Sequence, residues 1–219
     1  MAKIAPSVLG ADFSQLANEI RSADEAGVDM FHLDIMDGHF VPNISYGPAI
    51  VETIDRFTDT FLDVHLMLSE PEKYYEAFAK AGADSITFHI EVHPEPTVEA
   101  AAIRKLGCRP GLSLNPDTSV NTVLPFLAYF DYLLVMSVHP GFGGQSFIES
   151  ALDKVRAARE YIDRERLTTE IQVDGGVDAF NAERVVAAGA DILVMGTAFF
   201  GAGNRRELSE QVRQLAITR

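Results

Sequence analysis

The segment 32–38 contains the residue types with the clearest capacity for chemistry in this chain. It reads His-Leu-Asp-Ile-Met-Asp-Gly. Because successive side chains of a β-strand point to opposite faces, His32, Asp34 and Met36 would share one face. An imidazole and a carboxylate would then lie together near the carboxyl end of a strand, where parallel α/β folds build their sites. A structural role, with both groups buried and satisfied by neighbours, fits this segment equally well.

The composition indicates a globular chain and restricts its partners. The chain has 219 residues, 47% of them hydrophobic, and a formal net charge of -14 at pH 7. This acidity argues against nucleic acid or an anionic membrane surface as a partner. The single cysteine, Cys108, excludes an intrachain disulfide, and no apolar run is long enough to cross a membrane. Since no signal-peptide core precedes Asp12, we expect a cytoplasmic location.

Short apolar runs recur eight times and alternate with amphipathic segments. This pattern predicts eight β-strands and eight helices. The expected strands are 3–7, 30–34, 61–66, 85–89, 109–114, 132–136, 170–174 and 192–195. The expected helices are 19–26, 49–57, 71–81, 98–106, 118–126, 151–162, 179–188 and 207–215.

A repeated tetrapeptide supports this regularity. Ala-Gly-Val-Asp begins at Ala26, and Ala-Gly-Ala-Asp begins at Ala81 and Ala188, so that glycine follows the end of a helix each time. The sequence separations between successive copies are close to the lengths of two and of four βα units. Eight such units in a chain of this length predict a TIM (β/α)8 barrel, an α/β fold, as a single domain over residues 1–219. A doubly wound open sheet is disfavoured, because no Gly-x-Gly-x-x-Gly motif follows the first strand.

The carboxyl ends of all strands meet on one face of such a barrel, which would bring ionisable groups together from three strands. The residues are His32, Asp34, His65 and Asp174. Imidazole and carboxylate donors together suit one borderline divalent metal, Zn²⁺, Fe²⁺, Mn²⁺ or Co²⁺, and the sequence does not choose among these. A polar barrel mouth, in which the histidines hydrogen-bond to the carboxylates without a metal, is the alternative.

Glycine-rich segments follow the sixth, seventh and eighth expected strands. In this fold, backbone N–H groups there and a short extra helix, expected over 198–202, can form a phosphate site. Such a site needs no basic side chain, so an acidic protein can bind phosphate in this way. Tight turns would explain any one segment but explain all three less well. The segments are Gly141-Phe142-Gly143-Gly144, Gly175-Gly176 and Gly196-Thr197.

Other residues at the strand ends refine this prediction. Met36, Met67 and Met136 could form an uncharged wall beside a ligand, although core filling would explain any one of them. Lys3 and Asp63 would also face inward and could form a buried ion pair at the lower end of the barrel. No lysine stands at the carboxyl end of an expected strand, which argues against imine chemistry.

Six segments of the sequence occur in a combination typical of one known family. They are Ala5-Pro6-Ser7, 32–38, 63–67, Asn115-Pro116, 140–147 and 173–176. Together they resemble ribulose-phosphate 3-epimerase, from near the first residue to about Phe199. The resemblance implies that His32, Asp34, His65 and Asp174 hold one divalent metal and that Asp34 and Asp174 are the acid/base pair. It also implies sugar-phosphate contacts from Ser7, His65, Gly141, Phe142, Gly143, Gly144, Asp174, Gly175, Gly176, Gly196 and Thr197.

The activity implied by this resemblance is interconversion of ribulose 5-phosphate and xylulose 5-phosphate, a step of the pentose phosphate pathway. Inversion at C3 through a 2,3-enediolate needs two acid/base groups, and we assign Asp34 as acceptor and Asp174 as donor for ribulose 5-phosphate. The family also implies a homo-oligomer. A six-carbon substrate, allulose 6-phosphate, is the nearest alternative, and a catalytically silent phosphate-binding barrel is another.

Three positions differ from the patterns of this family and its relatives. Thr197 stands where the family often has serine, which keeps a hydroxyl for the phosphate. His139 stands where asparagine or glutamate is common, and it receives no role. His65 replaces the lysine of the Asp-x-Lys motif in related barrels that decarboxylate orotidine phosphate or condense hexulose phosphates. This replacement favours the epimerase.

Overall fold

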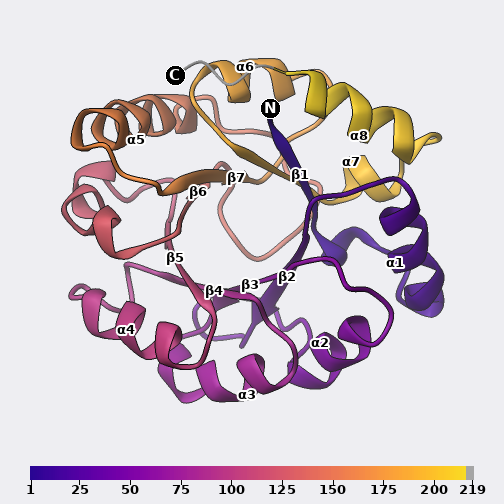
Figure 1. Cartoon of the computed structure of the whole chain (residues 1–219), viewed down its shortest axis with the longest axis horizontal. Coiled ribbons are helices and arrows are strands. Elements are labelled where there is room, and N and C mark those ends of the chain that lie inside the picture. Colours follow the sequence, from indigo (N-terminus) through magenta and orange to yellow (C-terminus); the bar gives the residue numbers. More distant parts are fainter. Residues whose placement is uncertain (216–219) are drawn as a thin grey trace.

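The eight apolar runs form eight parallel strands in a computed structural model of the chain, which describes residues 1–215. Each strand lies within two residues of its expected position, so the predicted strands are confirmed. Helices lie outside the strands, and together they make the predicted single-domain barrel (Figure 1). The strands are β1 (Lys3–Pro6), β2 (Phe31–Met36), β3 (Leu62–Met67), β4 (Ser85–His89), β5 (Arg109–Leu114), β6 (Tyr132–Met136), β7 (Glu170–Asp174) and β8 (Ile192–Met195).

Within residues 1–215, eight α-helices cover the barrel and occupy most of the predicted helical segments. The short extra helix expected over 198–202 is present as α7, one residue earlier than predicted. The helices are α1 (Leu16–Glu25), α2 (Pro48–Asp55), α3 (Tyr75–Lys80), α4 (Thr97–Lys105), α5 (Ala151–Glu165), α6 (Ala182–Ala187), α7 (Thr197–Phe200) and α8 (Arg205–Gln214).

The predicted helix 118–126 is wrong as an α-helix. The segment forms two 3₁₀ helices, η4 (Val120–Thr122) and η5 (Leu124–Tyr129). Pro125 lies in the first turn of η5, and a proline there has no N–H to continue an α-helix from the preceding turn. The amphipathic spacing therefore identified a buried face but not the type of helix.

The strands pair in the order β1-β8-β7-β6-β5-β4-β3-β2, all parallel. β1 and β2 complete the barrel through a single bridge between Ser7 and His32. The backbone N–H of Asp29, just before β2, also donates to the carbonyl of Ile4 at 3.1 Å. The barrel thus closes at a narrow seam, and one residue of that seam belongs to the predicted metal cluster.

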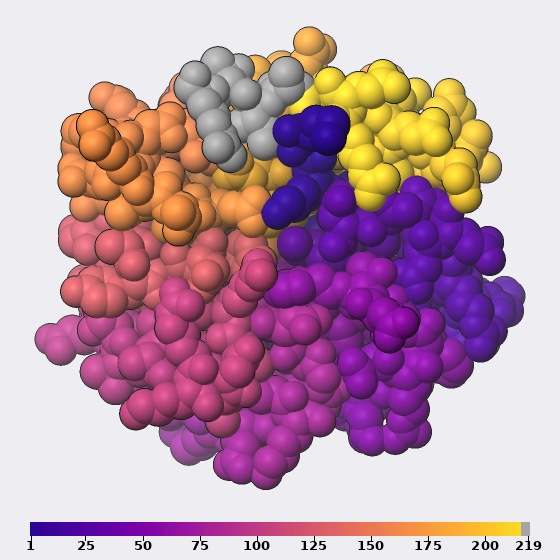
Figure 2. Space-filling model, in the orientation of Figure 1, coloured from indigo at the N-terminus to yellow at the C-terminus, as the bar shows by residue number. Residues whose placement is uncertain are grey.

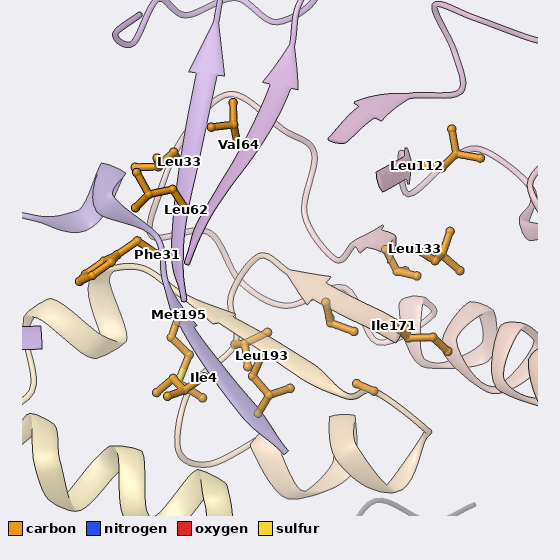
Figure 3. Close-up of a cluster of buried hydrophobic side chains, with 14 of the residues drawn as sticks. Ile4, Phe31, Leu33, Leu62, Val64, Leu112, Leu133, Ile171, Leu193 and Met195 are labelled. Atoms are coloured by element: carbon orange, nitrogen blue, oxygen red, sulfur yellow. The ribbon is translucent and has the colours of Figure 1, made fainter. Parts of the chain in front are cut away.

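The outer faces of the strands supply the main hydrophobic core. Phe31, Leu33, Val64 and Leu193 are fully buried there and pack with apolar residues of the helices. Figure 3 shows these side chains on their strands. Burial of this layer between the sheet and the helices is the main apolar stabilisation of the fold.

The interior of the barrel has an apolar side and a polar side. The apolar side comes mainly from β1, β6 and β8, where Ala5, Leu134 and Val194 belong to one buried cluster. The polar side comes from β2, β3, β4, β5 and β7. Its buried polar side chains are His32, Asp34, Asp63, His65, Ser85, Thr87, His89, Ser113 and Gln172.

The predicted ion pair between Lys3 and Asp63 is wrong. Lys3 Nζ lies 2.7 Å from Glu170 Oε1 at the amino-terminal rim, and its side chain is 39% exposed. Asp63 is fully buried and lies 2.8 Å from His32 Nδ1. The stagger of the strands places Lys3 near the start of β7, whereas Asp63 is in register with His32 on the adjacent strand.

Segments follow one another around the barrel, so the two ends of the described chain meet (Figure 2). The backbone N–H of Ala2 donates to the carbonyl of Leu215 at 3.3 Å. The last four residues of the predicted domain lie outside the described residues. Among residues 1–215, no helix combines the length and apolar character needed to span a bilayer.

Candidate metal centre and active site

The structure brings together the four side chains that the sequence assigned to a metal. His32 and Asp34 come from β2, His65 from β3 and Asp174 from the end of β7. One ligand atom from each lies within 4.8 Å of the other three. Such a cluster, from two imidazoles and two carboxylates, fits a borderline divalent cation.

Strand register explains why these groups converge. Asp34 is the direct neighbour of His65 on the adjacent strand, and Met36 is the neighbour of Met67 one step further along. The Nδ1 atom of His65 consequently lies 3.0 Å from Asp34 Oδ1. Residues that face inward at the same level of a parallel sheet must lie close together, so alternation and register position this part of the site.

His32 is held by a buried carboxylate on its other side. Its Nδ1 atom lies 2.8 Å from Oδ2 of Asp63, a residue whose carboxylate also accepts hydrogen bonds from Ser85 Oγ at 2.5 Å and Gln172 Nε2 at 3.0 Å. This arrangement turns His32 Nε2 toward Asp34 Oδ1 at 3.3 Å and Asp174 Oδ2 at 4.0 Å. A carboxylate behind a histidine is typical of metal ligands.

The Nε2 atom of His32 provides the test of fit for a metal. It is buried and makes no hydrogen bond. A buried polar atom without a partner is costly, and a cation bound to this nitrogen would remove the cost. A hydrogen-bonded cluster without a metal accounts for the contact of His65 with Asp34 but leaves this nitrogen unsatisfied. The donor set and the unsatisfied atom therefore both fit a divalent metal.

The two carboxylates of the cluster have opposite protonation tendencies. Burial and the negative charge of Asp34 raise the pKa of Asp174 to about 7. Burial also acts to raise the pKa of Asp34, but the positive charge of His32, together with the hydrogen bond and charge of His65, lowers it far below its usual range. At neutral pH one carboxylate is thus ionised while the other can hold a proton. A pair with separated pKa values is the usual arrangement for acid and base roles.

A pocket of about 600 Å³ opens above this cluster at the carboxyl ends of the strands. Asp34 and Asp174 line it, whereas His65 is fully buried beneath them and does not belong to its lining. The other residues that the sequence assigned to the sugar phosphate all line the pocket. They are Ser7, Gly141, Phe142, Gly143, Gly144, Gly175, Gly176, Gly196 and Thr197.

The glycines of the pocket are required by backbone geometry at two positions. Gly175 has a φ of +118°, and a Cβ there would lie 2.4 Å from Val138. Gly176 has a φ of +65°, and its Cβ would lie 2.6 Å from the backbone nitrogen of Phe147. Only glycine allows the loop after β7 to pass so close to the loop after β6.

The three methionines lie on the pocket wall, as predicted. Met36, Met67 and Met136 line the pocket and are at most 4% exposed. Two phenylalanines lie at its mouth: Phe142, which was assigned to the sugar phosphate, is 56% exposed, and Phe180, which received no role, is 94% exposed. His139, in contrast, does not line the pocket. Its Nδ1 atom lies 3.7 Å from Oδ2 of the exposed Asp117.

His89 and Glu91 were missed by sequence reasoning. His89 ends β4 and is fully buried, with Nε2 at 2.8 Å from Nε2 of His65. Its Nδ1 atom lies 3.1 Å from Oε2 of Glu91. The available signal was alternation, since Ser85, Thr87 and His89 share the inward face of their strand.

Comparison with known proteins assigns a family to the chain. Residues 3–200 match the model of the Ribulose-phosphate 3 epimerase family. The chain belongs to this family. It is 50% identical to ribulose-phosphate 3-epimerase from Synechocystis sp. over 96% of this chain and 92% of the relative. It is 44% identical to the Bacillus subtilis protein of the same name, over 97% and 99% of the two chains.

Solved structures of related barrels share the fold at low identity. KGPDC from Streptococcus mutans superposes with a TM-score of 0.72 at 13% identity, covering 98% of this chain and 99% of the other. A 3-hexulose-6-phosphate synthase gives 0.68 at 17% identity, covering 96% and 98%. These similarities establish the barrel, while membership of the epimerase family comes from sequence.

Proposed function

We propose that this chain inverts C3 of a 2-keto sugar phosphate, interconverting ribulose 5-phosphate and xylulose 5-phosphate. Family membership supports the reaction type. The observation that carries the proposal is the pair Asp34 and Asp174, a buried and a partly buried carboxylate of opposite protonation tendency that line one pocket. Inversion needs one group that takes the C3 proton and another that returns a proton to the opposite face.

Asp34 is suited to accept the C3 proton. His32 and His65 keep its carboxylate ionised, and Ser7 Oγ donates to its Oδ2 atom at 2.5 Å. Asp174 is suited to donate, because its raised pKa keeps a proton on this partly buried carboxyl group near neutral pH. In the reverse direction the two roles exchange. Each positioned group contributes roughly 10² to 10⁴-fold to the rate.

The residues that would hold a divalent cation are His32, Asp34, His65 and Asp174. When bound, such a cation acts as a Lewis acid for the negative charge that develops on the substrate oxygens at C2 and C3. The chain itself fixes the donors, since Asp63 holds His32 from behind. Metal analysis of the purified protein decides among Zn²⁺, Fe²⁺, Mn²⁺ and Co²⁺.

The glycine loops and the methionine walls of the pocket are suited to the phosphate and to the reacting carbon of the substrate. Backbone groups of the loops at Gly144, Gly176 and Gly196 can approach a phosphate without a basic side chain. The walls formed by Met36, Met67 and Met136 exclude water from the carbon that loses its proton. An acidic protein can therefore bind an anionic sugar phosphate at this place.

Replacing either carboxylate tests the proposal. Asp34→Asn and Asp174→Asn keep the side-chain shape but remove proton transfer, so both should lower loss of deuterium from C3 of ribulose 5-phosphate by at least ~10²-fold. Asp117→Asn is the matched control, because its side chain is 87% exposed and lies outside the pocket lining. Near-normal exchange in either variant of the pair would contradict the assigned roles.

Two further measurements complete the assignment. The ratio of kcat/KM for ribulose 5-phosphate and allulose 6-phosphate separates a five-carbon from a six-carbon substrate, and we expect the five-carbon compound to be preferred. No exchange at C3 in the metal-loaded, unmodified protein would instead indicate a silent phosphate-binding barrel. We also propose a homo-oligomer, which sedimentation equilibrium can establish.

A further inference from the structure

We propose that Glu91, acting through His89, is a positioning residue for His65 and fixes which nitrogen this histidine presents to the metal. The inference rests on the metal-dependent function proposed above. It concerns a carboxylate that does not line the substrate pocket and that belongs to the loop after β4.

A continuous line of contacts joins Glu91 to the metal cluster. Glu91 Oε2 lies 3.1 Å from Nδ1 of His89, and Nε2 of His89 lies 2.8 Å from Nε2 of His65. The opposite nitrogen of His65, Nδ1, lies 3.0 Å from Asp34 Oδ1 and faces the cluster. Both imidazoles are fully buried, so their nitrogens depend on these protein partners for hydrogen bonds.

The direction of these hydrogen bonds follows from the chemistry of neutral imidazole, which has one N–H and one acceptor nitrogen. When Nδ1 of His65 binds a cation, the proton of this imidazole must be on Nε2. The Nε2–H group must then donate to Nε2 of His89. His89 can accept there only when its own proton is on Nδ1. That N–H then donates to Glu91, so two imidazoles in series need an acceptor at the outer end.

Packing and hydrogen bonds hold both members of this outer pair in place. The ring of His89 stacks on that of His65, with centroids 5.0 Å apart, and contacts the ring of Phe40 at 4.6 Å. Glu91 Oε1 accepts from the backbone N–H of Asn115 at 2.8 Å and also from the hydroxyl of Thr118. The carboxylate is therefore fixed while its side chain stays 23% exposed.

The two histidines of the cluster are thus supported in different ways. His32 has a carboxylate, that of Asp63, directly behind it. His65 has an imidazole behind it, and a carboxylate only behind that imidazole. An outer partner of a metal-binding histidine commonly changes metal affinity 10- to 100-fold when it is lost. We assign that contribution for His65 to Glu91.

The experiment compares Glu91→Gln with Glu72→Gln. Glu72 is the matched control: its Oε2 also lies 3.0 Å from an imidazole nitrogen, that of His93, and its removal changes the net charge equally. Competition with a chelator measures the dissociation constants of Zn²⁺ and Co²⁺ for the folded proteins. The amide of glutamine has one acceptor oxygen, which the backbone N–H of Asn115 and the hydroxyl of Thr118 both require, so its NH2 group would face Nδ1 of His89 and disfavour the proton there. We therefore expect about 10-fold or greater weakening for Glu91→Gln, a changed visible spectrum of its Co²⁺ form, and wild-type values for Glu72→Gln. Equal dissociation constants and identical spectra for the two variants would overturn the proposal.

The unmodified protein provides a second test that does not depend on a variant. In the Zn²⁺-loaded protein, long-range ¹H–¹⁵N correlation spectra should place the proton of His65 on Nε2 and that of His89 on Nδ1. A proton on Nε2 of His89 would overturn the inference even if Glu91→Gln failed to fold. Failure of wild-type protein to bind either metal at the cluster would refute both this inference and the metal-dependent function. If the wild-type protein binds metal and Glu91→Gln has the same dissociation constants as Glu72→Gln, only the inference is refuted.

Discussion

The hydroxyl of Ser7 donates a 2.5 Å hydrogen bond to Oδ2 of Asp34, across the seam where the barrel closes. Ser7 follows β1 and Asp34 lies on β2, and the single bridge between these strands is formed by Ser7 and His32. Ser7 thus helps to close the barrel through its backbone and hydrogen-bonds to the acid/base residue Asp34 through its side chain.

Removal of this hydroxyl should leave the ionised carboxylate of Asp34 less stabilised and less firmly positioned. Hydrogen bonds to charged groups contribute about 1.5–3 kcal/mol, so Ser7→Ala should lower kcat by roughly tenfold or more and shift the acidic limb of the pH–rate profile upward. Ser45→Ala is the control, because Ser45 Oγ donates to the backbone carbonyl of Asp34 at 2.6 Å and not to its carboxylate. Equal profiles for the two variants would argue against the role of Ser7.

Metal affinity should increase as the pH rises toward neutrality. Burial and the charge of Asp34 raise the pKa of Asp174 to about 7, and Asp34 and Asp63 raise the pKa of His32 despite its burial. Below pH 7 a cation must therefore displace at least one proton, so the dissociation constant should fall by at least about tenfold per pH unit between roughly pH 5 and pH 7. Chelator competition at several pH values measures this slope. An affinity independent of pH would contradict the protonation of Asp174 and His32 in the metal-free cluster.

Asp63 should be important for stability as well as for the orientation of His32. It is fully buried and accepts hydrogen bonds from three side chains. Asp63→Ala leaves these donors unsatisfied and should lower the free energy of unfolding by about 3 kcal/mol. Asp63→Asn should cost less, because the hydroxyl of Ser85 can accept a hydrogen bond as well as donate one. Urea unfolding gives both values, and the exposed Asp117→Ala should change stability by less than about 0.5 kcal/mol.

Gly175 and Gly143 should respond differently to alanine. A Cβ at Gly175 would lie 2.4 Å from Val138 and the φ of +118° is unfavourable for other residues, whereas a Cβ at Gly143 would meet nothing within 4 Å. Gly175→Ala should therefore destabilise the protein by at least ~2 kcal/mol and raise KM for the sugar phosphate. Gly143→Ala should change stability by less than about 0.5 kcal/mol. Thermal unfolding and steady-state kinetics check both variants, and equal effects would show that the close approach at Gly175 is unimportant.

Strand positions and inward-facing residues were predictable from the sequence, because alternation of side chains is a local property of a strand. Asp34, His65 and Asp174 could be placed at strand ends on this basis, and the barrel then brought them together. The segment 118–126 was not predictable to the same degree, because an amphipathic pattern does not distinguish an α-helix from successive 3₁₀ turns when Pro125 interrupts it.

Side-chain contacts between different strands were the least predictable feature. Lys3 was paired with Asp63 because both face inward, but its partner depends on the stagger of the barrel, which places it near Glu170. His89 is the last residue of the expected strand 85–89, yet its contact with His65 depends on how deep each side chain lies in the interior. Sequence alternation gives the face of a residue and not its level along the barrel axis.

The register of β2 and β3 limits how members of this family can change in length. Asp34 and His65 are neighbours because the two strands pair without a shift from His32 and Asp63 to Met36 and Met67. Deletion of one residue within either strand would turn its polar side chains toward the helices and its leucines toward the pocket. Gain and loss of residues during divergence should therefore be confined to the connecting loops, while these two strands are inherited at constant length.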